Sequence, residues 1–196
     1  CLICWLPGTP AMADVTVGGG ETCSADPACI NRLHPDIPMA ARAEPGERIL
    51  FIGRDAGDLN IDPDEFSSGD SSPRLSFGVV HPLTGPVYIE GATVGDVLAV
   101  TIENIDPGPV GWTSASAFGF AGAAVESESR FIVWRLNDEY AVSDDLPGVR
   151  IPNASFPGVV TTMPGADQLQ QVLEREQQLA DAGGAVFSPD PDAAEP

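Results

Sequence analysis

The sequence predicts a mainly β protein of the α+β class, with a barrel-like or sandwich-like β body and one substantial helix near the C-terminus. The 196 residues include 21 glycines and 19 prolines. Both residue types disfavour helices, because glycine loses much backbone entropy and proline lacks an amide hydrogen. Short apolar runs between Gly- and Pro-rich turns are typical of strands. Only residues 166–182 repeat their apolar side chains at close to 3.6 residues.

The first thirteen residues differ in character from the rest of the chain. An apolar run from Cys1 to Leu6 precedes a Pro/Gly break and the sequence A-M-A at 11–13. This order resembles the end of a secretory signal peptide cleaved before Asp14. The alternative is an apolar N-terminal strand that packs on the body. A signal remnant predicts a periplasmic or secreted protein, with the cytoplasm as the alternative.

Two of the four cysteines bracket a short turn-prone loop. Cys23 and Cys29 enclose S-A-D-P-A, whereas Cys1 and Cys4 lie in the signal-like segment. In an exported protein Cys23 and Cys29 are candidates for a disulfide. Free thiols are a second alternative. Metal binding is a weaker third, because neither a histidine nor a second cysteine pair stands at zinc-finger spacing.

Apolar runs between turns predict the strands. The first pair flanks an E-P-G-E turn at 44–47, and a later pair flanks a T-V-G-D turn at 93–96. The expected strands are 40–43, 48–52, 86–89, 97–105, 130–136 and 139–142.

The remaining segments are predicted to be irregular, apart from the helix. Residues 14–32 are polar and Gly-rich, and residues 53–74 form a long acidic loop. The helix carries Asp167 in its first turn and ends before a Gly-Gly pair, both favourable features. Residues 188–196 form an acidic, Pro-rich tail, which leaves 14–187 as one β-rich domain.

The charge is strongly one-sided. Acidic residues number 29 against nine basic ones, all of them arginine, which gives a net charge of −20. A surface of this charge repels nucleic acids and anionic membranes, so neither is an expected partner.

Four residues stand where a ligand or catalytic group would face a cleft. His34 and His81 each precede a proline, Glu90 ends a predicted strand before a glycine, and Asp55 follows another strand. Asp55, Glu90 and either histidine would supply the oxygen and nitrogen ligands of a metal that activates water. The alternatives are structural corners for the histidines and a solvated surface acid for Asp55.

Familiar catalytic motifs are absent. The sequence has no G-x-S-x-G, H-E-x-x-H, P-loop or G-x-G-x-x-G pattern. Calcium binding by the Asp-rich segment 55–70 is an alternative function, although the segment lacks EF-hand spacing.

Several blocks resemble the acetamidase/formamidase family. They are N-R-L-H-P-D-I-P at 31–38, H-P-L-T-G-P-V-Y-I-E-G-A at 81–92 and G-D-V-L at 95–98. The resemblance extends over roughly residues 31–180. It implies a metal-dependent hydrolase that cleaves the C–N bond of small linear amides to a carboxylate and ammonia. By position, Glu90, Asp55 and His81 are the candidate catalytic residues, and Asp55, Glu90 and His34 the candidate ligands of a divalent ion, zinc before calcium.

The chain also departs from the family pattern. G-D-L at 57–59 stands where the family has G-G-Q, which allows a degenerate homologue that keeps the fold without catalysis. The later family blocks are missing, so we expect an N-terminal half that a second chain completes, in a higher oligomer of the pair. The remaining alternative is a non-catalytic, acidic, β-rich binding module.

Overall fold

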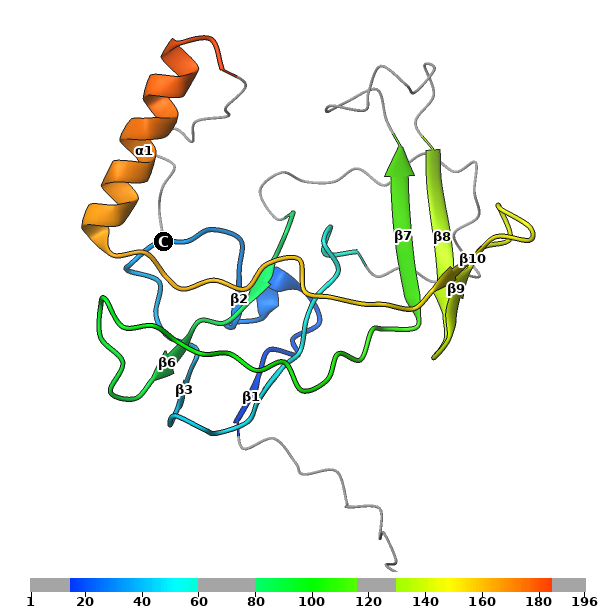
Figure 1. Cartoon of the computed structure of the whole chain (residues 1–196), viewed down its shortest axis with the longest axis horizontal. Coiled ribbons are helices and arrows are strands. Elements are labelled where there is room, and N and C mark those ends of the chain that lie inside the picture. Colours follow the sequence, from blue (N-terminus) through cyan, green and yellow to red (C-terminus); the bar gives the residue numbers. More distant parts are fainter. Residues whose placement is uncertain (1–14, 60–79, 116–129, 185–196) are drawn as a thin grey trace, which may run out of the picture. The chain divides into compact units, whose positions relative to one another are not determined.

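The protein is described here from a computed structural model, which covers residues 15–59, 80–115 and 130–184. The chain divides into two compact units (Figure 1). The first unit comprises residues 1–58, 78–97 and 161–196, and the second comprises 59–77 and 98–160. Each unit is described by itself.

The described part of the first unit contains three short sheets and one α-helix. The sheets are the parallel pair β1 (Val15–Val17) and β4 (Ile49–Phe51), the antiparallel pair β2 (Cys29–Ile30) and β5 (Leu83–Thr84), and the parallel pair β3 (Ala41–Ala43) and β6 (Val87–Ile89). A single 3-10 turn, η1 (Cys23–Ala25), precedes β2. The buried apolar side chains of this unit are small or medium-sized: Val17, Ala28, Ile37 and Ala43.

Gly18 lets the end of β1 lie against two neighbouring segments. A Cβ atom there would lie 2.8 Å from Thr84 Cγ2 and 2.9 Å from the carbonyl oxygen of Ile52. Its φ of 87° also lies in the left-handed region, which favours glycine. The Thr84 hydroxyl donates to the same Ile52 carbonyl at 2.9 Å, so this approach links β1, β4 and β5.

The second unit contains an antiparallel four-stranded sheet in the order β10-β9-β8-β7 (Figure 1). Its strands are β7 (Val110–Ala115), β8 (Arg130–Leu136), β9 (Tyr140–Val142) and β10 (Arg150–Pro152). Strand β8 supplies the buried side chains Phe131, Val133 and Trp134. The Trp112 ring stacks on Phe131 with centroids 5.2 Å apart, and the Trp134 indole N–H donates to Thr113 Oγ1 at 3.1 Å.

The helix α1 (Ala166–Asp181) follows the second unit in the sequence. Asp167 lies in its first turn, where a negative charge offsets the helix dipole. Gly183, with a φ of 81°, ends it and donates its N–H to the Ala180 carbonyl at 2.9 Å. Within the described ranges, no helix combines the length and the apolar character needed to cross a bilayer.

The predicted class is confirmed in part. The described residues are mainly β with a single α-helix, and β4, β6, β8, β9 and α1 fall within or close to their predicted ranges. The described strands form open sheets, so the barrel-like alternative is wrong for this part of the chain. The predictions for residues 1–13 and 188–196, and for most of 53–74, fall outside the described residues.

Three predictions about strands are wrong. Residues 97–105 form no strand, and within the described part of the chain no backbone hydrogen bond joins residues 98–102 to another segment. The E-P-G-E turn does not join a hairpin, since β3 and β4 each pair in parallel with a distant strand. Strands β1, β2 and β7 lie in polar or Gly-rich sequence where no strand was expected.

Two phenylalanines of the second unit are expected to contribute very differently to stability. Phe131 is 4% exposed and Phe156 is 81% exposed. We expect Phe131→Ala to lower the free energy of unfolding by about 3 kcal/mol, because it leaves a cavity under Trp112. Phe156→Ala, the matched control, should change it by less than about 0.5 kcal/mol in the 196-residue chain produced alone. Denaturant unfolding followed by tryptophan fluorescence measures both, and equal effects would contradict the assigned core.

Candidate functional site

Asp55 lies on a tight turn that follows β4. Its side chain is half-buried, and Oδ1 accepts the N–H of Gly57 at 2.8 Å. Its carbonyl oxygen accepts the N–H of Asp58 at 2.9 Å, which closes the turn. The carboxylate is therefore held in a fixed orientation by the backbone beside it.

The side chains on either side of Asp55 fasten this turn to the N-terminal loop. Arg54 Nε donates to Asp58 Oδ1 at 2.6 Å, and its two terminal nitrogens donate to the carbonyl oxygens of Gly20 at 2.6 Å and Glu21 at 3.0 Å. Asp58 Oδ2 accepts the N–H of Cys23 at 2.9 Å. Both charged side chains are only 12% exposed, so the ion pair is shielded from water. We call this set of contacts the Arg54 fork.

The loop gripped by the Arg54 fork is closed by a disulfide between Cys23 and Cys29. Of the three alternatives that the sequence left open for this pair, the structure contains the disulfide. Asp26 is buried within the loop, where its carboxylate accepts the N–H groups of Gly20 and Ala28, each at 2.9 Å. A covalent bond and two carboxylates thus hold residues 20–29 in one conformation.

Both carboxylates have lowered pKa values. The pKa of Asp26 lies below its ordinary 3.8 because the N–H groups of Gly20 and Ala28 stabilise the anion. Burial alone would raise the pKa of Asp58, but the N–H of Cys23 and the guanidinium of Arg54 outweigh burial and lower it below 3.8. Both groups are therefore charged at neutral pH, as their contacts require.

His81 is brought to the same turn as Asp55. Its N–H donates to the carbonyl oxygen of Ala56 at 2.6 Å, and its φ of 58° lies in the left-handed region. The residue is exposed. A strained backbone held by one short hydrogen bond is often found where a loop must present a side chain in a set direction.

Glu90 lies at the end of β6 and is paired with Arg42 of β3. Arg42 Nε donates to Glu90 Oε1 at 2.6 Å, and the guanidinium also covers the Tyr88 ring, 4.3 Å from its centroid. The hydrogen bond to Glu90 raises the pKa of Arg42. The Glu90 side chain is 33% exposed, so an arginine balances its charge at a partly open position.

His34 is held within its own corner. Its Nδ1 accepts the N–H of Asp36 at 3.2 Å and lies 3.8 Å from Asp36 Oδ2, and the side chain is 18% exposed. The carbonyl oxygen of His34 accepts the N–H of Ile37 at 3.2 Å. These contacts suit the structural alternative weighed for this histidine.

Of the four predicted site residues, the structure brings two together and places the other two in contacts of their own. Asp55 and His81 share one turn, Glu90 pairs with Arg42, and His34 contacts Asp36. Within residues 15–59, 80–115 and 130–184, no three His, Cys, Asp or Glu side chains lie close enough together to hold a metal ion. The described residues alone thus do not present the ligand set that Asp55, Glu90 and His34 were expected to form.

The sequence reasoning missed the Arg54 fork. A usable signal was present, because Arg54 and Asp58 bracket Asp55 and arginines are scarce in this chain. Asp58 also stands where the resembled family has the second glycine of G-G-Q, and its φ of 52° is one that glycine adopts easily. The substitution that seemed only to remove a family feature also adds a partner for Arg54.

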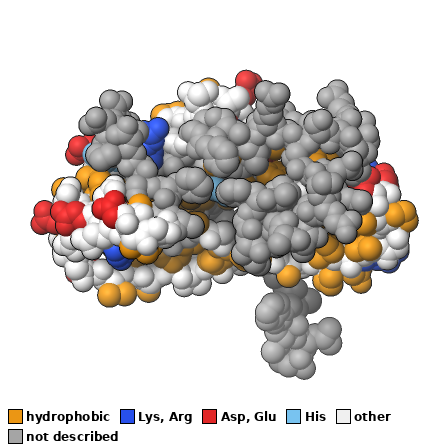
Figure 2. Space-filling view, turned by 90° about the horizontal axis from the view of Figure 1, so that it is seen from above, with side chains coloured by type: hydrophobic (Ala, Val, Ile, Leu, Met, Phe, Trp, Pro, Cys, Tyr) orange, Lys and Arg blue, Asp and Glu red, His pale blue; other side chains and the backbone are white. Residues whose placement is uncertain are grey.

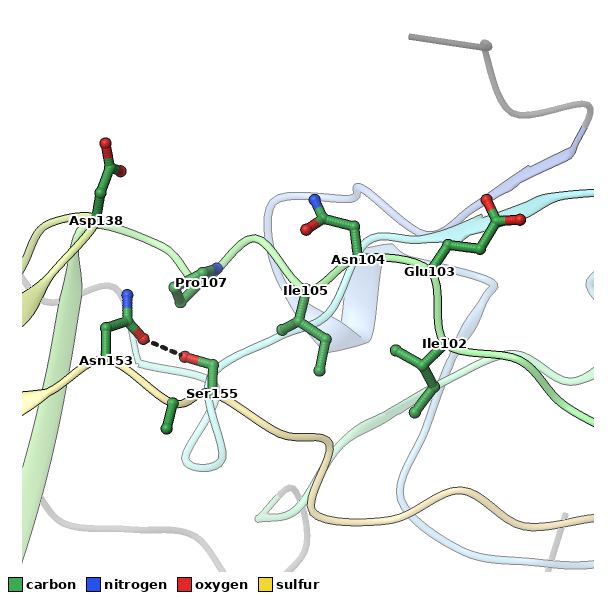
Figure 3. Close-up of a pocket in the computed structure, with 9 residues that line it drawn as sticks. Ile102, Glu103, Asn104, Ile105, Pro107, Asp138, Asn153 and Ser155 are labelled. Atoms are coloured by element: carbon green, nitrogen blue, oxygen red, sulfur yellow. Dashed lines mark hydrogen bonds between the residues drawn. The ribbon is translucent and has the colours of Figure 1, made fainter.

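A separate open cavity of about 470 Å³ lies in the second unit (Figure 3). It is lined by residues 102–105, Pro107, Asp138 and residues 153–155. It contains none of the four predicted site residues, which all belong to the first unit. Its chemistry is therefore considered apart from that of Asp55.

Comparisons with known proteins agree on one family. The sequence pattern of the acetamidase/formamidase family matches residues 20–196. An acetamidase from Mycolicibacterium smegmatis is 29% identical over 179 residues, covering 85% of this chain and 42% of that protein. A formamidase from Methylophilus methylotrophus is also 29% identical over 179 residues, covering 85% of this chain and 40% of that protein.

Solved structures support the fold. A gamma lactamase from Delftia acidovorans superposes with a TM-score of 0.72 at 24% identity, covering 91% of this chain and 47% of that chain. The protein thus spans less than half the length of these relatives.

The Arg54 fork predicts an acid-sensitive first unit. A carboxyl whose pKa is lowered by folding stabilises the fold fully above its unfolded pKa of 3.8, and this stabilisation is lost as the pH falls through the folded pKa. We expect Asp58→Asn to lower the free energy of unfolding by about 1–2 kcal/mol at pH 6. The difference from the unaltered protein should shrink below pH 4. Thermal unfolding followed by circular dichroism from pH 2.5 to 6 measures both effects.

Asp144→Asn is the matched control for that experiment, because the Asp144 side chain is 83% exposed. It should change stability little at any pH. An Asp58→Asn effect as small as the control's at pH 6 would show that the fork does not stabilise the unit.

Proposed function

Because this chain belongs to the acetamidase/formamidase family, we propose that it is part of a hydrolase that cleaves the C–N bond of small linear amides. The observation that carries this proposal is the family match over residues 20–196. The reaction consumes one water molecule and yields a carboxylate and ammonia or an amine. The names of the relatives, acetamidase and formamidase, support small linear amides as the substrate class.

The proposed chemistry needs a base for water and a proton for the leaving nitrogen. Amide carbonyls are poor electrophiles, so an ordered carboxylate that accepts the proton of an attacking water contributes much of the rate. We assign this role to Asp55, whose orientation is fixed by Gly57 and the Arg54 fork. His81, tethered to the adjacent Ala56, is assigned to proton transfer or to positioning of the amide.

Glu90 is the second candidate catalytic carboxylate. Its pairing with Arg42 favours a positioning role, because the guanidinium occupies one of the two carboxylate oxygens. The same pairing and the replacement of G-G-Q also favour the alternative function, a degenerate homologue or an acidic binding module without catalysis. Activity measurements on the complete protein decide between them.

A divalent ion, zinc before calcium, remains part of the proposal. Bound in a hydrolase, such an ion polarises a carbonyl or lowers the pKa of water. The described residues do not form a ligand set by themselves, so we derive no step through the ion and assign any such site to the complete protein.

We further propose that a second polypeptide segment supplies the rest of the fold. Support comes from the relatives, which are more than twice as long as the region that they share with this chain. The complete pair would then form a higher oligomer. We place it in the periplasm or outside the cell, with the cytoplasm as the alternative. The Cys23–Cys29 disulfide supports export, because disulfides persist in oxidising compartments.

Removing the Asp55 carboxylate should impair amide hydrolysis. In the complete protein isolated from its source, we expect Asp55→Asn to lower kcat/KM for formamide or acetamide by about 10²–10⁴-fold, the usual contribution of a general base. Asp144→Asn, an exposed acid of the second unit, should leave it within about twofold. Ammonia release gives the rates, and an Asp55→Asn protein that works as well as the control would remove Asp55 from the mechanism.

Chelation tests the metal separately. We expect the complete protein to contain a stoichiometric divalent ion by elemental analysis and to lose ammonia release after dialysis against a chelator, with recovery on adding zinc. Full activity in a protein that contains no metal would contradict this part of the proposal and leave amide hydrolysis standing.

A further inference from the structure

Two exposed apolar segments lie in the second unit. The first is residues 98–105, in which Val100 is 66% exposed and Ile102 is 53% exposed. The second is residues 149–160, in which Phe156 is 81% exposed. Figure 2 shows hydrophobic side chains lying open on the surface of the described part of the chain. Apolar side chains exposed in such numbers usually mark a surface that another element covers.

Residues 98–102 have the sequence pattern of a strand, but the described residues provide no neighbouring strand for them. Within the described residues, no backbone hydrogen bond joins residues 98–102 to any other segment. Leu98, Val100 and Ile102 are spaced two residues apart, so in an extended chain they share one face. A β-branched run with this alternation favours a strand, and a strand needs a neighbour for its N–H and C=O groups.

The two segments meet at the open cavity of the second unit. Ile102 and Ile105 line it from the first segment, and Asn153 and Ser155 line it from the second. In Figure 3 the side chains of Ile102 and Ile105 point to one side of the segment, whereas Glu103 and Asn104 point to the other. The apolar side chains at the end of the first segment therefore border the same hollow as residues 153–155 of the second segment.

We propose that residues 98–105 and 149–160 together form the surface on which the remainder of the family fold packs, with residues 98–102 pairing as a strand against it. This inference rests on the proposed completion of the fold by a second segment. The occupant follows from the relatives, because the structure that superposes on 91% of this chain contains as much chain again. Strand addition of this kind combines main-chain hydrogen bonds with burial of alternate side chains.

Hydrogen exchange of two preparations tests the surface. One is the protein isolated under native conditions from its source, and the other is the 196-residue chain produced alone. Strand pairing protects amides from exchange, so peptides covering 98–105 should exchange at least about tenfold more slowly in the native preparation. Peptides covering β3 should exchange alike in both, because β3 already pairs with β6.

A pair of valines provides the matched variants. Val100 lies on the proposed surface, and Val94 is 100% exposed on the 93–96 turn outside it. We expect Val100→Asp to abolish the protection of 98–105 in the native preparation and to weaken its association with the remaining segment. Val94→Asp should leave both as they are.

The outcomes separate this inference from the proposed function. Native protein that contains the remaining segment and hydrolyses amides, yet exchanges at 98–105 as fast as the chain alone, would overturn the surface and keep the function. Protection that arises in the chain alone through self-association, seen by light scattering, would assign the surface to a second copy and overturn the proposed occupant. Protected native protein without amide hydrolysis would keep the surface and remove the function.

Discussion

The first unit depends on the guanidinium of Arg54. Its sheets are pairs of strands two or three residues long, which are too small to persist by themselves. Arg54 joins Asp58 to the carbonyl oxygens of Gly20 and Glu21, and Asp58 in turn holds the N–H of Cys23. This fork fixes the disulfide loop against the turn that carries Asp55. The position of the candidate base is therefore a consequence of one shielded ion pair in a chain of net charge −20.

The second unit, in contrast, leaves part of its apolar surface exposed. Its sheet has a small core on β8, yet residues 98–105 and 149–160 expose apolar side chains, and no backbone hydrogen bond joins residues 98–102 to another described segment. Such a surface costs free energy in water unless something covers it. The length of the relatives supplies the reason, since more than half of each lies outside the part shared with this chain. Under the proposed function, completion of the fold and assembly of the catalytic unit are the same event.

The sequence predicted those elements whose residue pattern lies within a single segment. The predictions for 130–136 and 166–182 agree with β8 and α1. Each depends only on the spacing of apolar residues within its own segment. Strands β1 and β2 were not predicted. They lie in polar, Gly-rich sequence, and their partners β4 and β5 are more than 30 residues away along the chain. Residues 97–105 have the alternating pattern of a strand but form none, and residues 98–102 make no backbone hydrogen bond to another described segment. Asp55 and His81 were proposed as site residues from motifs, and the structure places them on one turn, whereas the Arg54 fork required the three-dimensional contacts.

The central claim is that this chain carries part of an amide hydrolase and needs the rest of the fold to act. Ammonia release from formamide and acetamide, measured side by side for the isolated 196-residue chain and for the complete native protein, tests it most directly. The account predicts release by the complete protein alone. Equal kcat/KM per chain in the two preparations would show that the site is already whole in this chain, and release by neither would leave the family likeness as fold without this activity.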